Sequence, residues 1–257
     1  MDASPTDDAA LDAVRTLLRA AAAHPGGLCV LTGAGMSAES GIATFRDALS
    51  GLWSKFDPAE LASEEGFLAD PQHVWDWYAE RRENVRQAQP NAGHRALADY
   101  AQRHPGALRL VTQNVDDLHQ RAGVADTIRL HGDILADHWL RRCPKADPCD
   151  TATAQPGRPP RCAECGNLAR PGVVWFGEML PPAAIEAAES AAVGCEAMLV
   201  VGTSGSVWPA AGLAAQARNC GATVLIVNPA PSEIDDEAHL VLRGTAATLL
   251  PALLAGL

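Results

Sequence analysis

The sequence predicts an α/β fold in which helices cover both faces of a parallel β-sheet and a smaller lobe is attached. Two features of the chain carry this prediction. Short apolar runs, typical of buried strands, alternate with longer stretches in which apolar residues recur at helical spacing. Between residues 141 and 172 this alternation stops, and proline, arginine, cysteine and glycine crowd together. That stretch is typical of a loop-rich insert and supplies part of the smaller lobe.

The expected elements follow one another along the chain. The first helix presents Leu11 and Val14 at helical spacing and ends at a Pro-Gly-Gly stop. Pro71 opens another helix, and Pro209 is expected as the first residue of a later one. We expect strands at 27–30, 107–112, 127–130, 197–201 and 223–227. We expect helices at 11–21, 71–89, 91–104, 182–193, 209–219 and 246–255.

Composition and charge narrow the classes of protein to which the chain can belong. Apolar residues make up 47% of the 257 residues, as in a globular protein. The 20 basic and 31 acidic residues give a net charge of −11, which argues against nucleic acid and anionic membranes as partners. The chain has no apolar run of about 18 residues, and its acidic beginning lacks the basic start of a secretory signal. We therefore expect a cytoplasmic protein with no nucleic-acid or membrane partner.

A glycine-rich loop directly follows the first predicted strand. Gly33 and Gly35 allow a tight turn that exposes backbone N–H groups, and Ser37 and Ser40 add hydroxyl donors. Such a junction is suited to bind a pyrophosphate close to the main chain. The third glycine falls at Gly41, so the loop departs from the common G-x-G-x-x-G spacing. From this segment alone, a simple glycine turn is the alternative.

Polar side chains also follow the other predicted strands. Asn114 and Asp116 follow the second strand, and His131 follows the third. Because the carboxyl ends of parallel strands meet at one edge of the sheet, we expect these side chains to line a common ligand-binding crevice. Ordinary structural roles are the alternative, since Asp116 could simply cap the helix behind it. Further residues at strand ends are Gln113, Gly132, Gly202, Thr203, Ser204 and Asn228.

Several segments together resemble the signatures of the sirtuins, a family of NAD-dependent protein deacylases. The first is the stretch of residues 31–46, which runs from the glycine loop to a Phe-Arg pair. Residues 112–116, with the sequence TQNVD, and residues 130–132, with the sequence LHG, resemble two more. One departure is Ala43, where family members usually carry proline. The resemblance extends over residues 10–255.

The resemblance implies a Rossmann-type NAD-binding domain with a smaller lobe that binds zinc and contributes helices. The main domain would comprise residues 1–46, 91–137 and 173–257, and the smaller lobe a helical part at 47–90 and a zinc ribbon at 138–172. The implied activity is NAD-dependent removal of acyl groups from lysine side chains of proteins, with release of nicotinamide and 2′-O-acyl-ADP-ribose. Two alternatives stay open: mono-ADP-ribosyl transfer to proteins, and an NAD-sensing or acyl-lysine-binding module without turnover.

The resemblance also assigns roles to individual residues. His131 is implied to act as the general base that activates a ribose hydroxyl, for which an imidazole is suited near neutral pH. A purely structural histidine is the alternative. Asn114 is implied to position the ribose or a water molecule, and Asp116 to hold the nicotinamide carboxamide. The other implied NAD contacts are Gly33, Ala34, Gly35, Ser37, Ala38, Thr44, Phe45, Arg46, Trp53, Gln113, Gly202, Thr203, Ser204, Asn228 and Ala246.

A second set of residues points to the acyl group of the substrate. Tyr78 and Arg81 stand three residues apart on a predicted helix, so both lie on one face. The pair resembles the Y-x-x-R motif of sirtuins that act on acidic acyl groups, bacterial members included. A malonyl or succinyl group ends in a carboxylate, which needs a guanidinium or phenol partner inside an apolar tunnel. A solvated helix face is the alternative. We expect succinyl, malonyl and acetyl groups to be removed, with the acidic groups favoured. The resemblance further implies peptide contacts by Val174 and Phe176 in a strand over residues 173–178.

Cysteine spacing predicts a structural zinc site in the loop-rich insert. Cys162 and Cys165 form a CxxC pair, which is one half of a zinc ribbon. Cys143 and Cys149 would complete a tetrahedral site, although they stand six residues apart. The family usually carries its first cysteine sooner after the LHG segment, so His138 is an alternative ligand. A metal-free or oxidised loop is the alternative to zinc. The remaining cysteines, which we expect to be inert residues of the core, are Cys29, Cys195 and Cys220.

Overall fold

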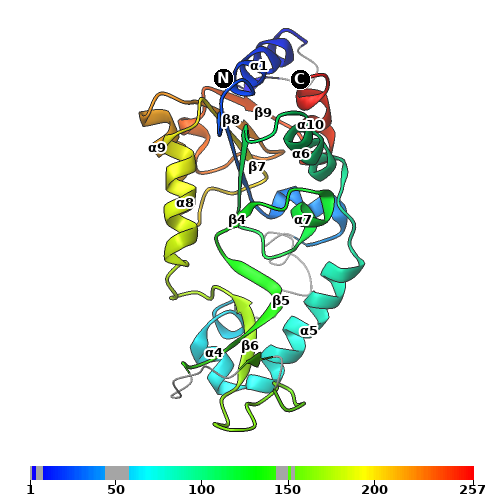
Figure 1. Ribbon diagram of the computed structural model, residues 1–257, viewed down its shortest axis with the longest axis vertical. Coiled ribbons are helices and arrows are strands. Elements are labelled where there is room, and N and C mark those ends of the chain that lie inside the picture. Colours follow the sequence, from blue (N-terminus) through cyan, green and yellow to red (C-terminus); the bar gives the residue numbers. More distant parts are fainter. Residues whose placement is uncertain (1, 4–7, 44–57, 143–149, 152–153) are drawn as a thin grey trace.

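The computed structural model describes residues 2–3, 8–43, 58–142, 150–151 and 154–257. In Figure 1, a parallel sheet with flanking helices occupies one end of the molecule, and a smaller group of helices and two strands occupies the other. The large sheet has seven strands, each parallel to its neighbours. This arrangement confirms the predicted α/β fold. In spatial order the strands are β1 (Asp2–Ala3), β9 (Leu240–Leu242), β8 (Thr223–Val227), β7 (Ala197–Val201), β2 (Leu28–Thr32), β3 (Leu108–Thr112) and β4 (Thr127–Arg129).

Strand geometry explains why the central strands are apolar throughout. Successive side chains of a strand point to opposite faces of the sheet. In β2, Leu28 and Val30 therefore join one apolar cluster, whereas Cys29 and Leu31 join another on the opposite face. The last residues of β2, β3 and β7 are paired in register. The loops that follow these three strands consequently begin side by side at one edge of the sheet.

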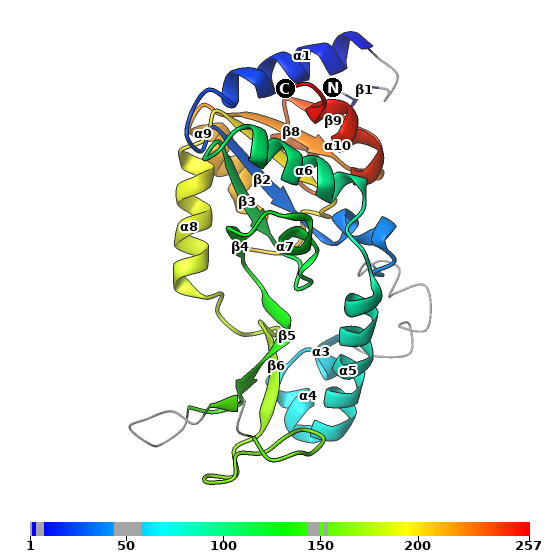
Figure 2. The same cartoon turned by 45° about the vertical axis from the view of Figure 1, so that its right-hand side comes forward.

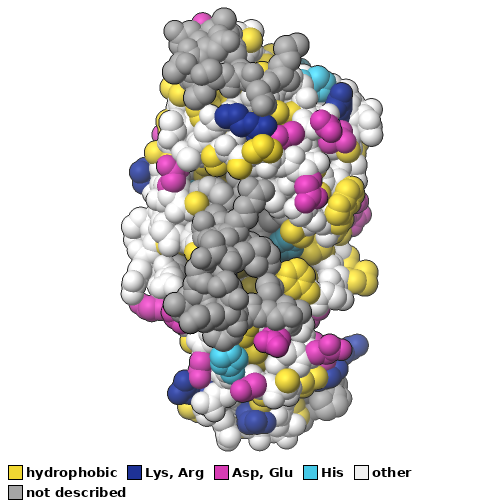
Figure 3. Space-filling view, turned by 180° about the vertical axis from the view of Figure 1, so that it is seen from behind, with side chains coloured by type: hydrophobic (Ala, Val, Ile, Leu, Met, Phe, Trp, Pro, Cys, Tyr) yellow, Lys and Arg dark blue, Asp and Glu magenta, His cyan; other side chains and the backbone are white. Residues whose placement is uncertain are grey.

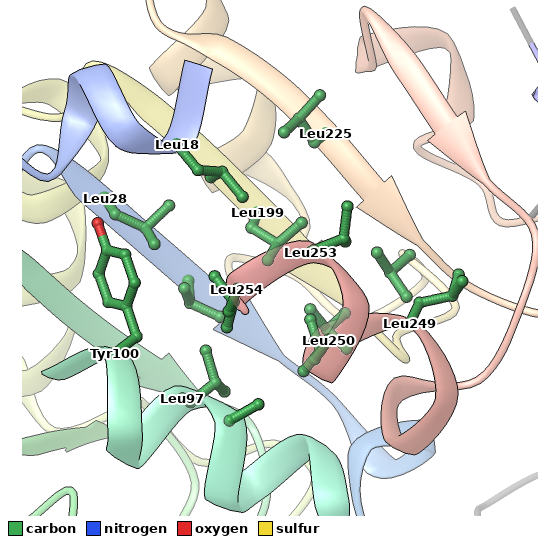
Figure 4. Packing of buried hydrophobic residues seen from close by; sticks show 14 of the residues in the cluster. Leu18, Leu28, Leu97, Tyr100, Leu199, Leu225, Leu249, Leu250, Leu253 and Leu254 are labelled. Atoms are coloured by element: carbon green, nitrogen blue, oxygen red, sulfur yellow. The ribbon is translucent and has the colours of Figure 1, made fainter. Parts of the chain in front are cut away.

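Helices cover the sheet from both sides, as Figures 1 and 2 show. One face is covered by α1 (Asp8–Ala21), α6 (Ala92–Arg103) and α10 (Ala246–Leu254). The other face is covered by α8 (Pro182–Val193) and α9 (Gly212–Asn219). In Figure 4, leucines from α1, α6 and α10 meet leucines of β2 and β7 in a continuous apolar layer. An apolar cluster is buried on each face of the sheet. Together the two clusters stabilise the sheet, whose strand ends carry the loops of the site.

The smaller part of the molecule has an apolar cluster of its own, which includes Phe67, Ile134 and Trp175. The smaller part consists of α3 (Pro58–Leu61), α4 (Glu64–Ala69), α5 (Pro71–Gln87), β5 (Gly132–Trp139) and β6 (Ala169–Val173). The two strands are antiparallel. The buried guanidinium of Arg82 ties α5 to β5. Its Nε donates to the carbonyl of Ile134 at 2.5 Å, and its Nη2 donates to that of Ala136 at 3.0 Å. Figure 2 shows α5 beside these strands, below the large sheet.

The predicted helices and strands of the large sheet are confirmed, but several bounds differ, such as those of the first strand, which was expected at 27–30 and is β2 at Leu28–Thr32. The helix expected from Pro209 begins only at Gly212. The residues before it form a turn, in which the N–H of Ala211 donates to the carbonyl of Val207. The strand expected over residues 173–178 is also wrong, because β6 ends where that segment begins.

The elements that the sequence did not reveal are short or lie in stretches without periodicity. They include α3, α4, α7 (Leu118–Ala122), β1, β5, β6 and β9. A segment of three to six residues offers too few positions for a helical or strand period to be recognised.

None of the described helices combines the length and the apolar content needed to span a bilayer. On the face shown in Figure 3, acidic and basic side chains are interspersed among uncharged ones.

Candidate functional site

The glycine loop after β2 packs directly against the loop after β7. The N–H of Gly33 donates to the carbonyl of Val201 at 3.0 Å, and the N–H of Gly35 donates to that of Gly202 at 2.8 Å. A Cβ on Gly35 would lie 2.7 Å from the Cα of Gly202, so no larger residue fits. The N–H groups of Gly33 and Gly35 themselves are thus used in loop packing. These glycines allow two loops to approach each other.

Two exposed residues of the same loop begin short helical turns. Ala34 and Ala38 are exposed, and each opens a short 3-10 turn, Ala34–Met36 and Ala38–Ser40. The N–H at the start of such a turn has no partner within the turn. These two donors, at the carboxyl edge of a parallel sheet, are placed where a phosphate group can accept from them.

Three of the predicted residues form one buried hydrogen-bonded set. The Ser37 hydroxyl donates to Oδ2 of Asp116 at 2.9 Å and accepts from Nδ2 of Asn114 at 3.1 Å. Oδ1 of Asp116 also accepts from the N–H of Leu118, at the start of α7. Asp116 thus accepts from the first N–H of α7 and also belongs to the polar set. Burial raises the pKa of Asp116, although the bonds from Leu118 and Ser37 oppose that shift.

Thr203 joins the loops after β3, β7 and β8. Its hydroxyl accepts from Nε2 of Gln113 at 3.0 Å, and its carbonyl accepts from Nδ2 of Asn228 at 3.1 Å. Gly202 next to it adopts a left-handed conformation, with φ of +63°. Ser204 follows, and its carbonyl accepts from the N–H of Glu233 at 2.8 Å. The structure therefore brings together the predicted residues of three separate strands.

His131 stands between β4 and β5, and its ring orientation is fixed by one hydrogen bond. Nδ1 lies 2.9 Å from the carbonyl oxygen of Gln113. A carbonyl oxygen only accepts, so Nδ1 carries the proton and Nε2 carries the lone pair. Burial lowers the pKa of His131, and the bond to Gln113 opposes the shift only in part. At neutral pH this imidazole is thus an uncharged base.

A cavity of about 450 Å³ adjoins Asp116, and α5 forms one of its walls. Arg81 lines the cavity, and its guanidinium stacks on the ring of Trp77 at 4.5 Å. Burial lowers the pKa of Arg81, and the carboxylate residues Asp76 and Glu80 of α5 line the same cavity. Tyr78 is 5% exposed and packs in the small apolar cluster with Phe67 and Trp175, and it is not among the described residues that line the cavity. The remaining described residues along the cavity include Ile42, Ala43, Val115 and Ile134.

The segment that follows β6 is held by an ion pair and by the small cluster. Arg170 pairs with Glu178, whose Oε2 also accepts from the N–H of Trp175 at 2.8 Å. The N–H of Val174 donates to the carbonyl of His131 at 2.9 Å. Phe176 is exposed beside this segment. The backbone of Val174 thus contacts that of His131, whereas the N–H of Phe176 donates to the carbonyl of Ala62, and both residues lie outside any strand.

Part of the predicted zinc site is described. The N–H of Gly166 donates to the carbonyl of Cys162 at 3.0 Å, and Gly166 has φ of +72°. This tight turn brings Cys165 back toward Cys162. His138, the alternative ligand, is exposed on β5 and pairs in register with Arg170. No cluster of three or more metal-binding side chains occurs within the described residues.

Six residues named in the sequence analysis lie outside the described part of the chain: Thr44, Phe45, Arg46, Trp53, Cys143 and Cys149. Residues 47–57, which were assigned to the smaller lobe, lie outside it as well. The site is therefore described by the loops after β2, β3, β4, β7 and β8, by α5, and by the start of α10.

Comparison with known proteins identifies the family. The Sir2 family model matches residues 33–209, from the glycine loop to the turn before α9. The chain belongs to the Sir2 family. This confirms the resemblance to sirtuins drawn from the sequence, and the matched region holds every loop of the polar edge except the one that contains Asn228.

Known relatives of this Sir2 protein match it in sequence or in structure along most of the chain. A protein of Ralstonia nicotianae, described as an NAD-dependent protein deacylase, is 58% identical over 226 residues, covering 88% of this chain and 90% of the relative. The solved structure of a Sir2 homolog–NAD complex superposes with a TM-score of 0.82 at 39% identity, covering 99% of this chain and 94% of that one. Sir2Tm bound to a propionylated peptide gives a TM-score of 0.76 at 29% identity, covering 91% and 94%.

The Sir2 protein also contains supporting residues that the sequence analysis missed. Nδ2 of Asn91 donates to the carbonyl of Met36 at 2.8 Å, and its side chain caps α6 together with His94. Glu39 accepts from the N–H of Ala247 at 3.0 Å, so the glycine loop also holds the start of α10, where the predicted contact Ala246 lies. A capping box ahead of α6 was the sequence signal for Asn91 and His94.

Two buried histidines lie beneath the polar edge. The rings of His94 and His119 are 4.8 Å apart between centroids, and both side chains are almost fully buried. His94 Nδ1 accepts from the N–H of Asn91, and His119 Nε2 lies 3.1 Å from the hydroxyl of Thr32. Burial lowers the pKa of His94 to about 4 and that of His119 to about 3. Both rings are therefore uncharged in the folded protein near neutral pH.

This pair predicts a loss of stability in mild acid. In the unfolded chain both histidines titrate near pH 6.5, so between about pH 6.5 and 4 the unfolded state binds more protons. The free energy of unfolding should fall by up to about 2.7 kcal/mol per pH unit in that window. Urea unfolding at pH 7.5, 6 and 5 measures this slope. A His94→Asn, His119→Asn variant should flatten the slope, whereas exposed His24→Asn should keep it. Equal stability at pH 7.5 and 5 in the wild type contradicts the prediction.

Proposed function

We propose that this Sir2 protein removes acyl groups from lysine side chains of proteins in an NAD-dependent reaction. The observation that carries the proposal is the buried set of Ser37, Asn114 and Asp116, which lies with His131 at the carboxyl edge of the sheet. Its Ralstonia relative, described as an NAD-dependent protein deacylase, is 58% identical in sequence over 88% of this chain. The arrangement of these side chains and the similarity to this relative both support NAD-dependent deacylation.

The described residues fit NAD. Exposed N–H donors at Ala34 and Ala38 suit its phosphates, and the amides of Gln113 and Asn228 meet at Thr203 beside them. When bound, NAD supplies a ribose carbon that gives up nicotinamide and a hydroxyl group that takes over the acyl group. Asp116 has a carboxylate at the cavity wall that can accept from a carboxamide N–H. The proposed contacts outside the described residues are Thr44, Phe45, Arg46 and Trp53.

His131 is proposed as the general base. Its Nε2 carries the lone pair because Nδ1 donates to the carbonyl of Gln113. Burial keeps the ring uncharged at neutral pH, so Nε2 can take a proton from a ribose hydroxyl. Asn114, fixed by Ser37, is proposed to position that ribose or a water molecule.

The acyl group is proposed to enter the cavity beside α5. This cavity has walls from both parts of the molecule, since Arg81 belongs to α5 and Asp116 to a loop of the large sheet. The proposed substrate site thus lies between a main domain of residues 1–46, 91–137 and 173–257 and a smaller lobe. A guanidinium in this wall favours an acyl chain that ends in a carboxylate. We therefore propose that succinyl and malonyl groups are preferred over acetyl groups.

A structural zinc ion is proposed for the smaller lobe, held by Cys143, Cys149, Cys162 and Cys165. The turn from Cys162 to Gly166 supports it, because hydrogen-bonded turns of this kind place two thiolates of a CxxC pair toward one metal. His138 is the weaker candidate. Burial raises the pKa of Glu178, but bonds from Arg170 and the backbone lower it, and the charge of His138 adds to that lowering. His138 therefore interacts with the Arg170–Glu178 pair.

The reaction itself is tested with acylated peptides. Nicotinamide released from NAD only in the presence of an acyl-lysine peptide, together with the mass of 2′-O-acyl-ADP-ribose, supports deacylation. A protein product that gains the mass of ADP-ribose favours ADP-ribosyl transfer instead. Binding of NAD and peptide with no nicotinamide release overturns the enzyme proposal in favour of a binding module.

His131→Ala should abolish deacylation while leaving NAD affinity within about tenfold, because loss of a general base typically costs about 10²–10⁴ in rate. Initial rates of nicotinamide release and calorimetric NAD binding measure the two effects. The matched control is His24→Ala, which removes an exposed imidazole at the end of α1. Turnover near the wild-type rate in the His131→Ala protein would refute the assignment.

Arg81→Met should lower desuccinylation by about 100-fold, because a charge-assisted bond is worth about 1.5–3 kcal/mol and a buried unpaired carboxylate costs more. Deacetylation should change much less, since an acetyl group carries no charge. The values of kcat/KM on the two acyl peptides give the comparison. Arg86→Met is the control, because Arg86 lies exposed on the same helix. Equal losses for both acyl groups would leave a plain deacetylase.

Metal analysis of the native protein should find about one zinc per chain, since the insert holds little apolar material and metal binding contributes folding energy there. Cys162→Ser should lose the metal and destabilise the smaller lobe. Cys220→Ser, at an exposed cysteine far along the chain, should keep both. Native protein without zinc would end the proposal. Zinc retained in Cys143→Ser but lost in His138→Ala would reassign a ligand.

A further inference from the structure

We infer that Arg129 is a positioning residue, which holds the cavity wall that carries Asp116 against the segment that carries His131. The inference rests on the proposed function, in which Asp116 accepts from the nicotinamide carboxamide and His131 acts as the base. It deepens that function by adding a residue that acts through these two. Arg129 is the last residue of β4, and its side chain is 18% exposed.

The guanidinium of Arg129 binds two successive carbonyl groups of the loop after β3. Its Nη2 donates to the carbonyl of Val115 and to that of Asp116, both at 3.0 Å. This nitrogen carries two N–H groups, so the two bonds do not compete for one proton. Both bonded residues line the cavity of about 450 Å³. Arg129 therefore fixes the stretch of backbone from which the carboxylate of Asp116 extends.

The other terminal nitrogen of the guanidinium ties this loop to the segment around His131. Nη1 pairs with Oδ2 of Asp133, two residues after His131, at 2.8 Å. The second oxygen of Asp133 accepts from a backbone N–H of β5 at 2.8 Å, so the carboxylate is itself held. The N–H of Ile134 donates to the carbonyl of Val115 at 3.0 Å. That carbonyl thus receives one bond from Arg129, before His131 in the sequence, and one from Ile134, after it.

The planar fork of an arginine suits this set of acceptors. The acceptors are two carbonyl oxygens of one loop and a carboxylate oxygen of β5. A lysine ammonium also has three donors, but they radiate from one nitrogen at the end of a flexible chain, so it acts as a point charge. Replacing Arg129 by lysine therefore keeps the charge and removes the bridge.

The charge of Arg129 also acts on Asp116 through space. Burial raises the pKa of Asp116, while hydrogen bonds from Leu118 and Ser37 lower it. The nearby charge of Asp117 raises it further, and that of Arg129 lowers it. Only an ionised carboxylate accepts at both oxygens, which a contact with a carboxamide N–H uses. An effect of charge alone is thus the competing explanation, and Arg129→Lys separates it from positioning.

Hydrogen exchange of the protein without NAD tests the hold on the loop. In Arg129→Met and in Arg129→Lys, the backbone N–H of Ile134 should exchange about tenfold faster, because its acceptor Val115 is no longer held by the guanidinium. The N–H groups of β7 should keep their wild-type rates. Arg121→Met is the matched control, since Arg121 also forms an ion pair and donates to a carbonyl, that of Val85 at 2.9 Å. Unchanged exchange at Ile134 in both Arg129 variants overturns the inference.

Inhibition by nicotinamide and by ADP-ribose tests the consequence for the site. Nicotinamide carries the carboxamide that Asp116 is proposed to bind, whereas ADP-ribose lacks it. In Arg129→Met, the nicotinamide concentration that halves deacylation of a peptide should rise by about tenfold, and that of ADP-ribose by less than about twofold. Arg129→Lys should show the same difference between the two inhibitors, and Arg121→Met should show none.

Each other outcome has a definite meaning. Wild-type exchange and inhibition in Arg129→Lys would show that the charge suffices, and would overturn the positioning role. Equal weakening of inhibition by nicotinamide and ADP-ribose marks a general loss of structure and overturns it as well. If Arg129→Met does not fold, Arg129→Lys carries both comparisons. If the wild type releases no nicotinamide from NAD, the proposed function fails, and the exchange rate of Ile134 still decides whether Arg129 holds the loop.

Discussion

The site depends above all on the close contact between the backbones that follow β2 and β7. Gly35 donates to Gly202 at 2.8 Å, and a Cβ on Gly202 would lie 2.5 Å from the nitrogen of Met36. Only residues without side chains permit this approach. Once the two loops are in contact, Ser37 reaches Asp116, and Thr203 reaches the residues after β3 and β8. The polar edge is thus a consequence of three small residues that carry no chemistry of their own.

Burial sets the protonation states at this edge. It disfavours the charged form of every group it encloses, and it therefore lowers the pKa of His131 and raises that of Asp116. Hydrogen bonds then decide which atom carries each proton, as the carbonyl of Gln113 does for His131. The same effect keeps His94 and His119 uncharged below the edge. Desolvation that prepares a base for proton transfer thus also makes the fold sensitive to acid.

A continuous set of contacts joins the proposed base to the proposed acyl pocket. The carbonyl of His131 accepts from Val174, the next residue is Trp175, and its indole bonds the phenol of Tyr78. Arg82, buried on the same helix as Tyr78, anchors α5 to β5, the strand that begins directly after His131. The helix that carries the proposed specificity residues is therefore held to the strand that leaves the catalytic loop.

The sequence by itself determined the α/β fold, the main strands and helices, and the polar residues of the edge, because strand and helix periods and strand-end positions are local properties. Tertiary structure decided what the residues do there. Gly33 and Gly35 predicted a tight turn, but the sequence could not show that their own N–H groups are used in loop packing, because Gly202 approaches from a strand far along the chain. The bond from Trp175 to Tyr78 likewise has no local signal, because packing of β6 against α5 creates it. Periodicity shows which face of an element is buried, but only the assembled fold shows which partner each buried polar atom meets.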